Sequence, residues 1–311
     1  MKLIHLTLLL LSALVLNGCI DEDLSSCYDC DKDNLLLDFL YTDKEGADIF
    51  ADNIQGVDVF VYDSNDFFVK QHYVTKSELS VYAGTELSLL PGTYRLVCWA
   101  NVAEKTSITE PTKGTPYSDA ILDFATTKEG DAVTTGGDPL YYAPKVEDSS
   151  SSKTFTVTVP EKGTHKATIS FRSAHMVIEL YVKGFEDNSL LPLIELSGVP
   201  AGYNFDLQTF GPSVTYSGVA TNQTIDGQQM AVVKFITPLF DRDTPIKVHI
   251  KKQSDGSTLT TVSLDDFISD NNIIISNITQ VVIPIYVEYM QTSVDITLPA
   301  WRSIPVWPEI N

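Results

Sequence analysis

Short runs in which apolar and polar residues alternate dominate the chain from Asn34 onward. In the run 57–62, for example, Val57, Val59 and Val61 would share one face of an extended strand. β-Branched and aromatic residues are enriched in these runs, and no stretch of twelve residues has helical periodicity. The pattern therefore predicts an all-β protein. We expect strands at 35–40, 57–62, 94–99, 154–159, 167–171, 176–182, 231–236, 246–250, 259–262, 273–275, 281–287 and 294–298.

Turn-forming pairs such as Pro91-Gly92 and Asp226-Gly227 separate these runs. Strands at this spacing are typical of β-sandwiches rather than of a parallel α/β sheet. Residues 103–152 differ, because Thr, Ser, Gly, Pro and Asp are common there, and we interpret them as a long excursion between strands of a first domain. The chain is long enough for two cores. We predict domains at 34–165 and 166–295, followed by a tail at 296–311.

The first residues have the form of a lipoprotein signal peptide. Lys2 precedes a largely apolar run at 3–16, which is too short to span a bilayer. Leu16 and Gly18 stand three positions and one position before Cys19, a pattern that resembles the bacterial lipobox. We expect a signal peptide at 1–18, acyl chains such as palmitate on Cys19, and a tether at 19–33. The alternative is an ordinary secretory signal with a Cys near its cleavage site.

Acidic residues outnumber basic residues in this chain. There are 21 Lys and Arg against 41 Asp and Glu, which gives a net charge of −20. Loss of Lys2 with the signal peptide would bring the net charge to about −21. Because such a field repels phosphate groups, we expect no nucleic-acid partner. The acidic cluster from Asp21 to Asp23 either marks display on the outer leaflet or is a solvated part of the tether.

Three cysteines remain once Cys19 is acylated, namely Cys27, Cys30 and Cys98. Cys27 and Cys30 have the CxxC spacing of redox pairs and of zinc half-sites. No second CxxC, no His pair at ligand spacing and no thioredoxin-like pattern accompanies them. In an oxidising compartment a structural disulfide from one of the two to Cys98 is the better interpretation. We take Cys27 with Cys98 as the candidate pair.

Familiar signatures of catalysis are absent from the sequence. There is no GxSxG, GxxxxGK[ST] or GxGxxG motif, and the four histidines of the mature chain are isolated from one another. We therefore expect no catalytic residues, no metal site and no cofactor apart from the covalent lipid on Cys19.

Three motifs of this chain together resemble one family. They are the N-terminal segment Gly18–Cys27, the strand Pro91–Asn101 with the sequence PGTYRLVCWAN, and the tail Val294–Trp307. They are similar to the FimB-like fimbrial anchor subunits, relatives of the fimbrillins that build type V pili. The resemblance implies two tandem transthyretin-like β-sandwich domains. It also implies a lipid anchor in the cell outer membrane, exposure at the cell surface as part of a fimbrium, and fimbrial stalk subunits as partners.

The resemblance also implies how the subunits join. A partner's strand fills an open groove in a sandwich, and an anchor keeps its own first strand in place. The strand at 35–41 would then fill the protein's own groove. The tail would be the donor segment for the next subunit, or else a last strand folded onto its own domain. Its candidate contact residues are Val294, Ile296, Leu298, Trp301, Ile304, Val306 and Trp307.

The expected function is that of a structural, non-enzymatic subunit that anchors a fimbrium to the outer membrane and supports adhesion. The alternative is a surface-exposed carbohydrate-binding lipoprotein that uses Tyr141, Tyr142, Trp301 and Trp307. Two of these aromatics follow the flexible loop at 136–140, which would either recognise a ligand or be held to its own domain. A glycoside-active enzyme would need two facing carboxylates in a pocket.

Overall fold

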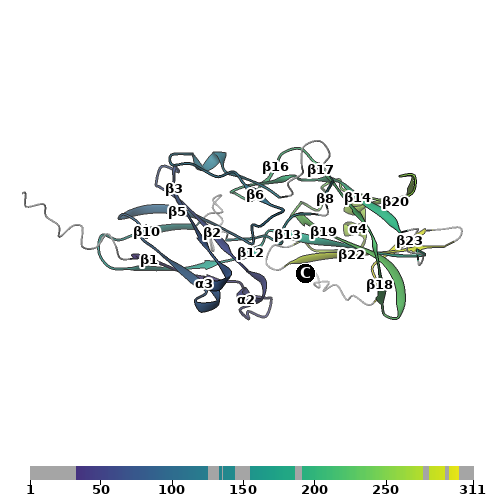
Figure 1. Ribbon diagram of the computed structural model, residues 1–311, viewed down its shortest axis with the longest axis horizontal. Helices are drawn as coiled ribbons and strands as arrows, with labels where there is room; N and C mark the ends of the chain where they lie inside the picture. Colours follow the sequence, from purple (N-terminus) through teal and green to yellow (C-terminus); the bar gives the residue numbers. More distant parts are fainter. Residues whose placement is uncertain are drawn as a thin grey trace, which may run out of the picture.

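The computed structural model describes residues 33–124, 133–134, 136–143, 155–185, 191–275, 280–290 and 294–300. Strands dominate these residues, which confirms the expected all-β class. The molecule is elongated, with the N-terminal strands at one end and the C-terminal strands at the other (Figure 1).

Two sheets form the N-terminal half. The first has the order β11-β1-β4, and the second has the order β12-β9-β5-β2-β3, with β10 also paired to β5. Buried side chains from both sheets form one shared core, for example Leu37 and Val59. The strands of the two sheets are β1 (Leu35–Leu40), β2 (Val57–Tyr62), β3 (Phe68–Val74), β4 (Gly84–Leu87), β5 (Gly92–Ala100), β9 (Tyr141–Tyr142), β10 (Phe155–Val159), β11 (His165–Ser170) and β12 (Arg172–Ser173).

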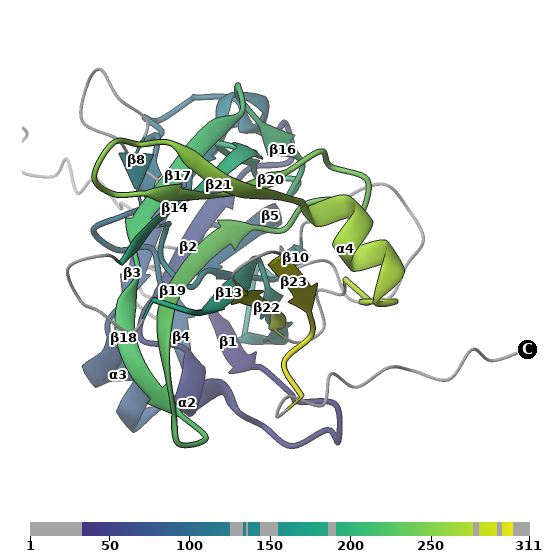
Figure 2. The same ribbon diagram turned by 90° about the vertical axis from the view of Figure 1, so that its right-hand side faces the viewer.

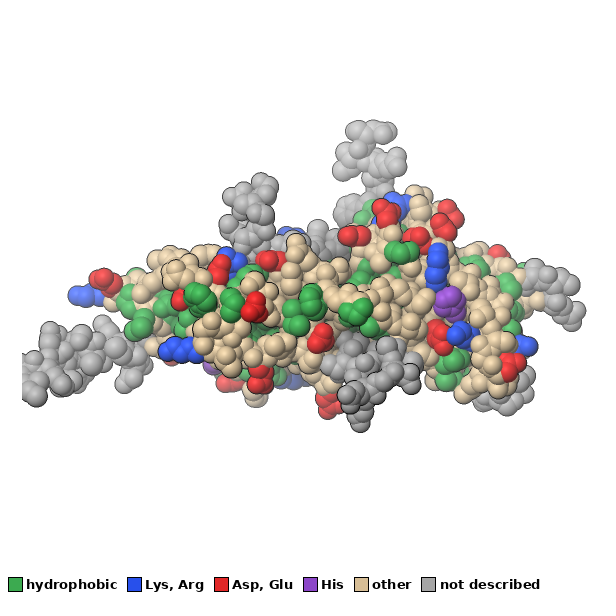
Figure 3. Space-filling view, turned by 90° about the horizontal axis from the view of Figure 1, so that it is seen from above, with side chains coloured by type: hydrophobic (Ala, Val, Ile, Leu, Met, Phe, Trp, Pro, Cys, Tyr) green, Lys and Arg blue, Asp and Glu red, His purple; other side chains and the backbone are tan. Residues whose placement is uncertain are grey.

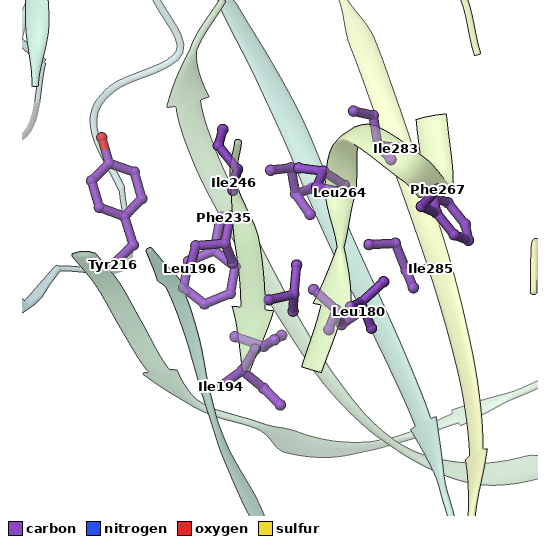
Figure 4. Close-up of a cluster of buried hydrophobic side chains, with 14 of the residues drawn as sticks. Leu180, Ile194, Leu196, Tyr216, Phe235, Ile246, Leu264, Phe267, Ile283 and Ile285 are labelled. Atoms are coloured by element: carbon purple, nitrogen blue, oxygen red, sulfur yellow. The ribbon is translucent and has the colours of Figure 1, made fainter. Parts of the chain in front are cut away.

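Two five-stranded sheets form the C-terminal half. Their orders are β18-β19-β13-β22-β23 and β21-β20-β14-β17-β8. Figure 4 shows side chains of both sheets, among them Leu180, Ile194 and Phe235, gathered in one buried cluster. The strands are β8 (Val133–Thr134), β13 (His175–Lys183), β14 (Pro192–Val199), β17 (Val214–Val219), β18 (Thr221–Ile225), β19 (Gln228–Pro238), β20 (Lys247–Lys252), β21 (Thr258–Ser263), β22 (Val281–Tyr289) and β23 (Val294–Thr297).

A fifth sheet joins the two halves. It has the order β16-β15-β7-β6, so β6 (Ser107–Ile108) and β7 (Ile121–Asp123) pair across to β15 (Gly202–Asn204) and β16 (Thr209–Phe210). A third core of mostly aromatic side chains lies at this junction, with Trp99 stacked on Tyr203 at a centroid distance of 6.0 Å. The excursion after Ala103 therefore does not stay within the first domain as we interpreted it. It connects the halves instead.

Strand pairing also bears on the predicted boundary between residues 165 and 166. All six residues of β11 pair with β1, and β12 pairs with β9. Residues up to Ser173 thus belong with the N-terminal sheets, and the change to C-terminal sheets comes at β13. Whether the two halves are separate domains stays a prediction.

Helices are short among the described residues. They are α2 (Phe50–Asn53), α3 (Lys76–Val81), α4 (Leu264–Asp270) and the 3-10 helix η2 (Tyr117–Asp119). A capping box starts α3, because the Thr75 hydroxyl accepts from Glu78 N and the Glu78 carboxylate accepts from Thr75 N. Figure 2 shows α4 beside β22 and β23, and its Leu264, Phe267 and Ile268 are buried in the C-terminal core.

The expected strand at 273–275 is wrong. These residues follow α4 without strand pairing, and only Ile273 is buried in the core while Ile274 is 48% exposed. Three consecutive isoleucines resemble a buried strand, yet here the chain is leaving a helix. A short apolar run cannot distinguish these cases without its partners.

Candidate assembly interface

The first described strand, β1, occupies the middle of its sheet. It pairs in parallel with β11, from Leu35↔His165 to Leu40↔Ser170, and antiparallel with β4, from Leu35↔Leu87 to Asp38↔Gly84. Burial alternates along β1 as the sequence pattern predicts. Leu35, Leu37 and Phe39 are buried, and the residues between them are half-buried. A strand with partners on both sides and a buried face completes this sheet.

Polar contacts hold β1 at its start and along its outer face. The Asn34 side chain donates to the Leu89 carbonyl at 2.6 Å and accepts from Leu89 N at 3.0 Å, while the Asn34 carbonyl accepts from His165 N at 2.8 Å. On the outer face, Asp38 pairs with Lys166 of β11 at 2.9 Å and accepts a hydrogen bond from the Tyr82 hydroxyl. The hydrogen bond from Tyr82, and then Lys166, lower the pKa of Asp38.

Side-chain contacts close the edge at which β3 and β4 lie. His72 of β3 contacts the Thr85 hydroxyl of β4 at 2.9 Å, and Lys70 donates to the Ser88 carbonyl at 3.1 Å. Burial is the main cause that lowers the pKa of His72, which favours the neutral ring in this contact. At the other edge, β10 and β11 follow each other in the chain and pair with β5 and β1, one in each sheet. Within the described residues, the N-terminal half has no vacant strand position next to β1.

The C-terminal segment lies at a sheet edge. β23 pairs antiparallel with β22, from Tyr289↔Val294 to Tyr286↔Thr297, and ends the strand order of its sheet. Ile296 and Leu298 are half-buried against the C-terminal core, whereas Val294 is 37% exposed. The structure therefore places the first three of the predicted contact residues along the edge of the protein's own C-terminal sheet. The other four, Trp301, Ile304, Val306 and Trp307, lie outside the described residues.

The cysteines are placed only in part. Cys98 is a free thiol, 1% exposed, in the N-terminal core, and burial raises its pKa. Its candidate partner Cys27, the neighbouring Cys30 and the predicted lipid site Cys19 lie outside the described residues. Within the described residues Cys98 packs as a small apolar core residue, and its pairing with Cys27 stays a prediction.

The aromatic pair proposed for sugar stacking is not at the surface. Tyr141 and Tyr142 are 3% and 5% exposed, and their rings pack on Tyr41 and Trp99 at 5.0 and 5.9 Å. Of the two interpretations of this loop, the structure shows the one in which the loop is held to the protein. An added Cβ on Gly137 would come within 2.1 Å of the Phe124 carbonyl, which explains glycine there by close packing.

His175 is a buried residue whose role the sequence did not reveal. Its Nδ1 donates to the Leu140 carbonyl at 2.8 Å, and Gln280 contacts its Nε2 at 2.8 Å. The backbone of Gln280 also hydrogen bonds to Tyr41, just after β1. His175 and Gln280 therefore link the end of β1 to the start of β13 and β22. An isolated His in a strand pattern gives no signal for such a junction.

Neither a metal cluster nor a membrane-spanning helix occurs in the part of the chain that the structure describes. There, His, Cys, Asp and Glu side chains nowhere gather in threes that could hold a metal ion. The longest helix there, α4, runs only from Leu264 to Asp270, and none has the length and apolar character needed to span a bilayer. On the face shown in Figure 3, acidic side chains are spread along the molecule, and apolar side chains lie in separate small groups.

Solved structures share this fold at low sequence identity. A candidate adhesin from Bacteroides ovatus has a TM-score of 0.67 and 15% identity, covering 86% of this chain and 93% of that one. Candidate polysaccharide-binding proteins from Bacteroides thetaiotaomicron have a TM-score of 0.66 and 14% identity, and the match covers 83% of this chain and 91% of that one. The fimbrial anchor protein Mfa2 from Porphyromonas gingivalis has a TM-score of 0.61 and 13% identity, and the match covers 84% of this chain and 96% of that one. At these identities the likeness shows the fold alone.

A family model matches most of the sequence. It describes the fimbrillin-A associated anchor proteins Mfa1 and Mfa2, and it matches residues 25–304. A search of curated proteins found no match. The family match includes β1, the PGTYRLVCWAN strand and β23, and so it confirms the resemblance to fimbrial anchor subunits seen in the sequence. The chain belongs to the family of fimbrillin-A associated anchor proteins.

Proposed function

We propose that this protein is a non-enzymatic lipoprotein that holds the base of a fimbrium on the outer membrane. Membership of the anchor family supports a role as an accessory subunit of a fimbrium. The observation that carries the finer proposal is the position of β1, which fills the centre of its own sheet. A subunit whose N-terminal half is already complete has no need of a donated strand there, so assembly would end at this subunit.

The lipid on Cys19 supplies the membrane attachment in this proposal. Cys19 precedes Asn34 by 15 positions in the sequence, so the tether would connect the acyl chains directly to β1. Since β1 is held between two strands, a pull on the fimbrium would reach the membrane through the folded protein. More than one acyl chain makes such an anchor effectively stable.

Contact with the stalk subunit would be made by residues 294–307. β23 has one edge paired to β22, and its sequence alternates apolar with polar residues, as a strand for β-augmentation requires. Within the described residues its outer edge has no partner strand. A strand of the stalk subunit would either pair with this edge or accept β23 and the residues after it as a donor.

Glycan binding is less well supported than assembly. Tyr141 and Tyr142 are buried, so of the four aromatic residues predicted to bind a glycan only Trp301 and Trp307 remain as candidates. The description of one structural neighbour as polysaccharide-binding concerns that neighbour. Glycan binding is therefore the alternative function, and it becomes the better supported one if Cys19→Ala cells keep their fimbriae.

The experiment compares fimbriated cells that carry Cys19→Ala with cells that carry the wild-type chain. We expect the variant to shed its fimbriae into the medium, because its fold is intact while its lipid site is gone. Cys27→Ala is the matched control, since it removes another thiol of the same tether and should leave the fimbriae on the cells. If Cys19→Ala cells keep their fimbriae, the proposal is wrong.

A further inference from the structure

We infer that β1 and β11 form a mechanical clamp that resists tension between the N-terminal tether and the rest of the protein. The two strands run parallel, with six residue pairs in register from Leu35↔His165 to Leu40↔Ser170. The tether enters β1 at Leu35. β11 leaves the pair at Ser170 and continues through β12 into β13 of the C-terminal half. The two loads therefore reach the pair at opposite ends.

This geometry loads the pair in shear. A pull on the tether draws β1 toward its Leu35 end, and the C-terminal half draws β11 toward its Ser170 end. Both forces lie along the strand axis in opposite directions, so the bonds between the strands share the load and must fail together. If the two forces acted at the same end, the bonds would instead open one at a time. Parallel pairing is the reason for the difference, because it puts the tether and the continuing chain at opposite ends.

Contacts along the pair add to its resistance. The bond from His165 N to the Asn34 carbonyl, 2.8 Å, stands at one end, and the bond from Phe171 N to the Leu40 carbonyl, 2.7 Å, stands at the other. Between them the Phe39 ring meets the Phe171 ring edge-on at 5.6 Å. Sliding β1 would also expose its buried leucines to water, which is unfavourable.

The test is a single-molecule pulling experiment on the purified, unacylated mature chain. Cys19, Cys27 and Cys30 are replaced by Ser, and Cys98 is buried, so two introduced cysteines carry the handles. One pair, Asp33→Cys with Arg172→Cys, pulls at opposite ends of β1 and β11. The matched pair, Asp33→Cys with Thr164→Cys, pulls at the same end. Asp33, Thr164 and Arg172 are all exposed.

We expect the first pair of handles to rupture at a force at least about twofold higher than the second at the same loading rate, since forced unfolding follows the unfolding barrier. Equal forces, or a lower force for the first pair, would overturn the clamp. This inference rests on the proposed function only for the source of the load. The measurement uses no fimbriae, so its failure would leave the result of the Cys19→Ala experiment untouched.

A second variant examines the hydrogen bonds themselves. In the Asp33–Arg172 geometry, His165→Pro removes the N–H that donates to Asn34, at the first residue of a strand, where proline is tolerated. His165→Ala keeps the N–H. We expect the proline variant to lower the rupture force and the alanine variant to leave it unchanged. Equal rupture forces for both would contradict a clamp built on these bonds. If the proline variant does not fold, the comparison of rupture forces between the two handle pairs is the test of the clamp.

Discussion

His175 is a single buried residue that connects the two halves of the molecule, and its environment makes it sensitive to pH. Burial is the largest cause that lowers its pKa, from 6.5 to about 4, and the charge of Lys234 acts in the same direction, while the hydrogen bond to Leu140 opposes both. The folded state therefore holds a neutral ring at pH values where the unfolded chain binds a proton. Stability that depends on this ring is fully present above pH 6.5 and is lost as the pH falls toward 4.

We predict that His175→Asn removes this part of the pH dependence. Asn has no titrating ring, and its amide can still donate to the Leu140 carbonyl. Between pH 6.5 and pH 4 the free energy of unfolding of the wild type should fall by roughly 3 kcal/mol more than that of the variant. Denaturant unfolding at several pH values measures the difference. Parallel curves for the two proteins would show that His175 does not titrate in this way.

Asp138 stabilises a loop from within rather than recognising a ligand. It is 9% exposed, and its carboxylate accepts from Ala103 N and from Lys105 N, both at 3.1 Å. We predict that Asp138→Ala costs about 1–3 kcal/mol of unfolding free energy, because both N–H groups lose their acceptor. Asp138→Asn keeps one oxygen and should cost less. A loss of the same size in both variants would mean that the hydrogen bonds are not the cause.

At the scale of elements, β1 is the strand on which the account depends. Its Leu37 is fully buried in the N-terminal core, and its neighbour Leu36 is half-buried on the opposite face. We predict that Leu37→Ala lowers the free energy of unfolding by about 2–5 kcal/mol, since it leaves a cavity, and that Leu36→Ala lowers it much less. Chemical denaturation of both variants measures this. Equal losses would argue against a β1 packed as described.

The strong strands could be predicted from the sequence, and the weak ones could not. The alternating runs at β1, β2 and β22 carry their own signal, because every second residue is apolar and faces a core. β7 and β15 have three residues each, and they pair with each other across the junction as the two central strands of the fifth sheet. A pattern of three residues cannot predict pairing with a strand about eighty residues away. The fifth sheet was therefore missed.

The sequence also does not show which of its aromatic residues are buried. Tyr141 and Tyr142 beside two glycines fit an exposed recognition loop as well as a packed one, and only the neighbouring Tyr41 and Trp99 decide between them. The role of β1, by contrast, was expected from the family resemblance. Its central place in the sheet supports that expectation, and the roles of Cys19 and of residues 301–307 stay predictions.

At the scale of the whole molecule, the contact with a stalk subunit should lie at one edge of one sheet. We predict that a photoreactive residue at Thr297, exposed on β23, captures a stalk subunit in fimbriated cells. The same probe at Gln223, exposed on β18 at the opposite edge of that sheet, should not. The crosslinked products are identified by mass spectrometry. Capture at Gln223 alone would place the partner at the other edge and refute a contact through residues 294–307.

The central claim is that this subunit keeps its first strand and its lipid while it holds a fimbrium. The most direct measurement is the intact mass of the chain extracted from the washed outer membranes of fimbriated cells. We expect a single species that begins at acylated Cys19 and still contains β1. A chain that begins after Leu40 would mean that β1 is removed before assembly, and it would contradict the account.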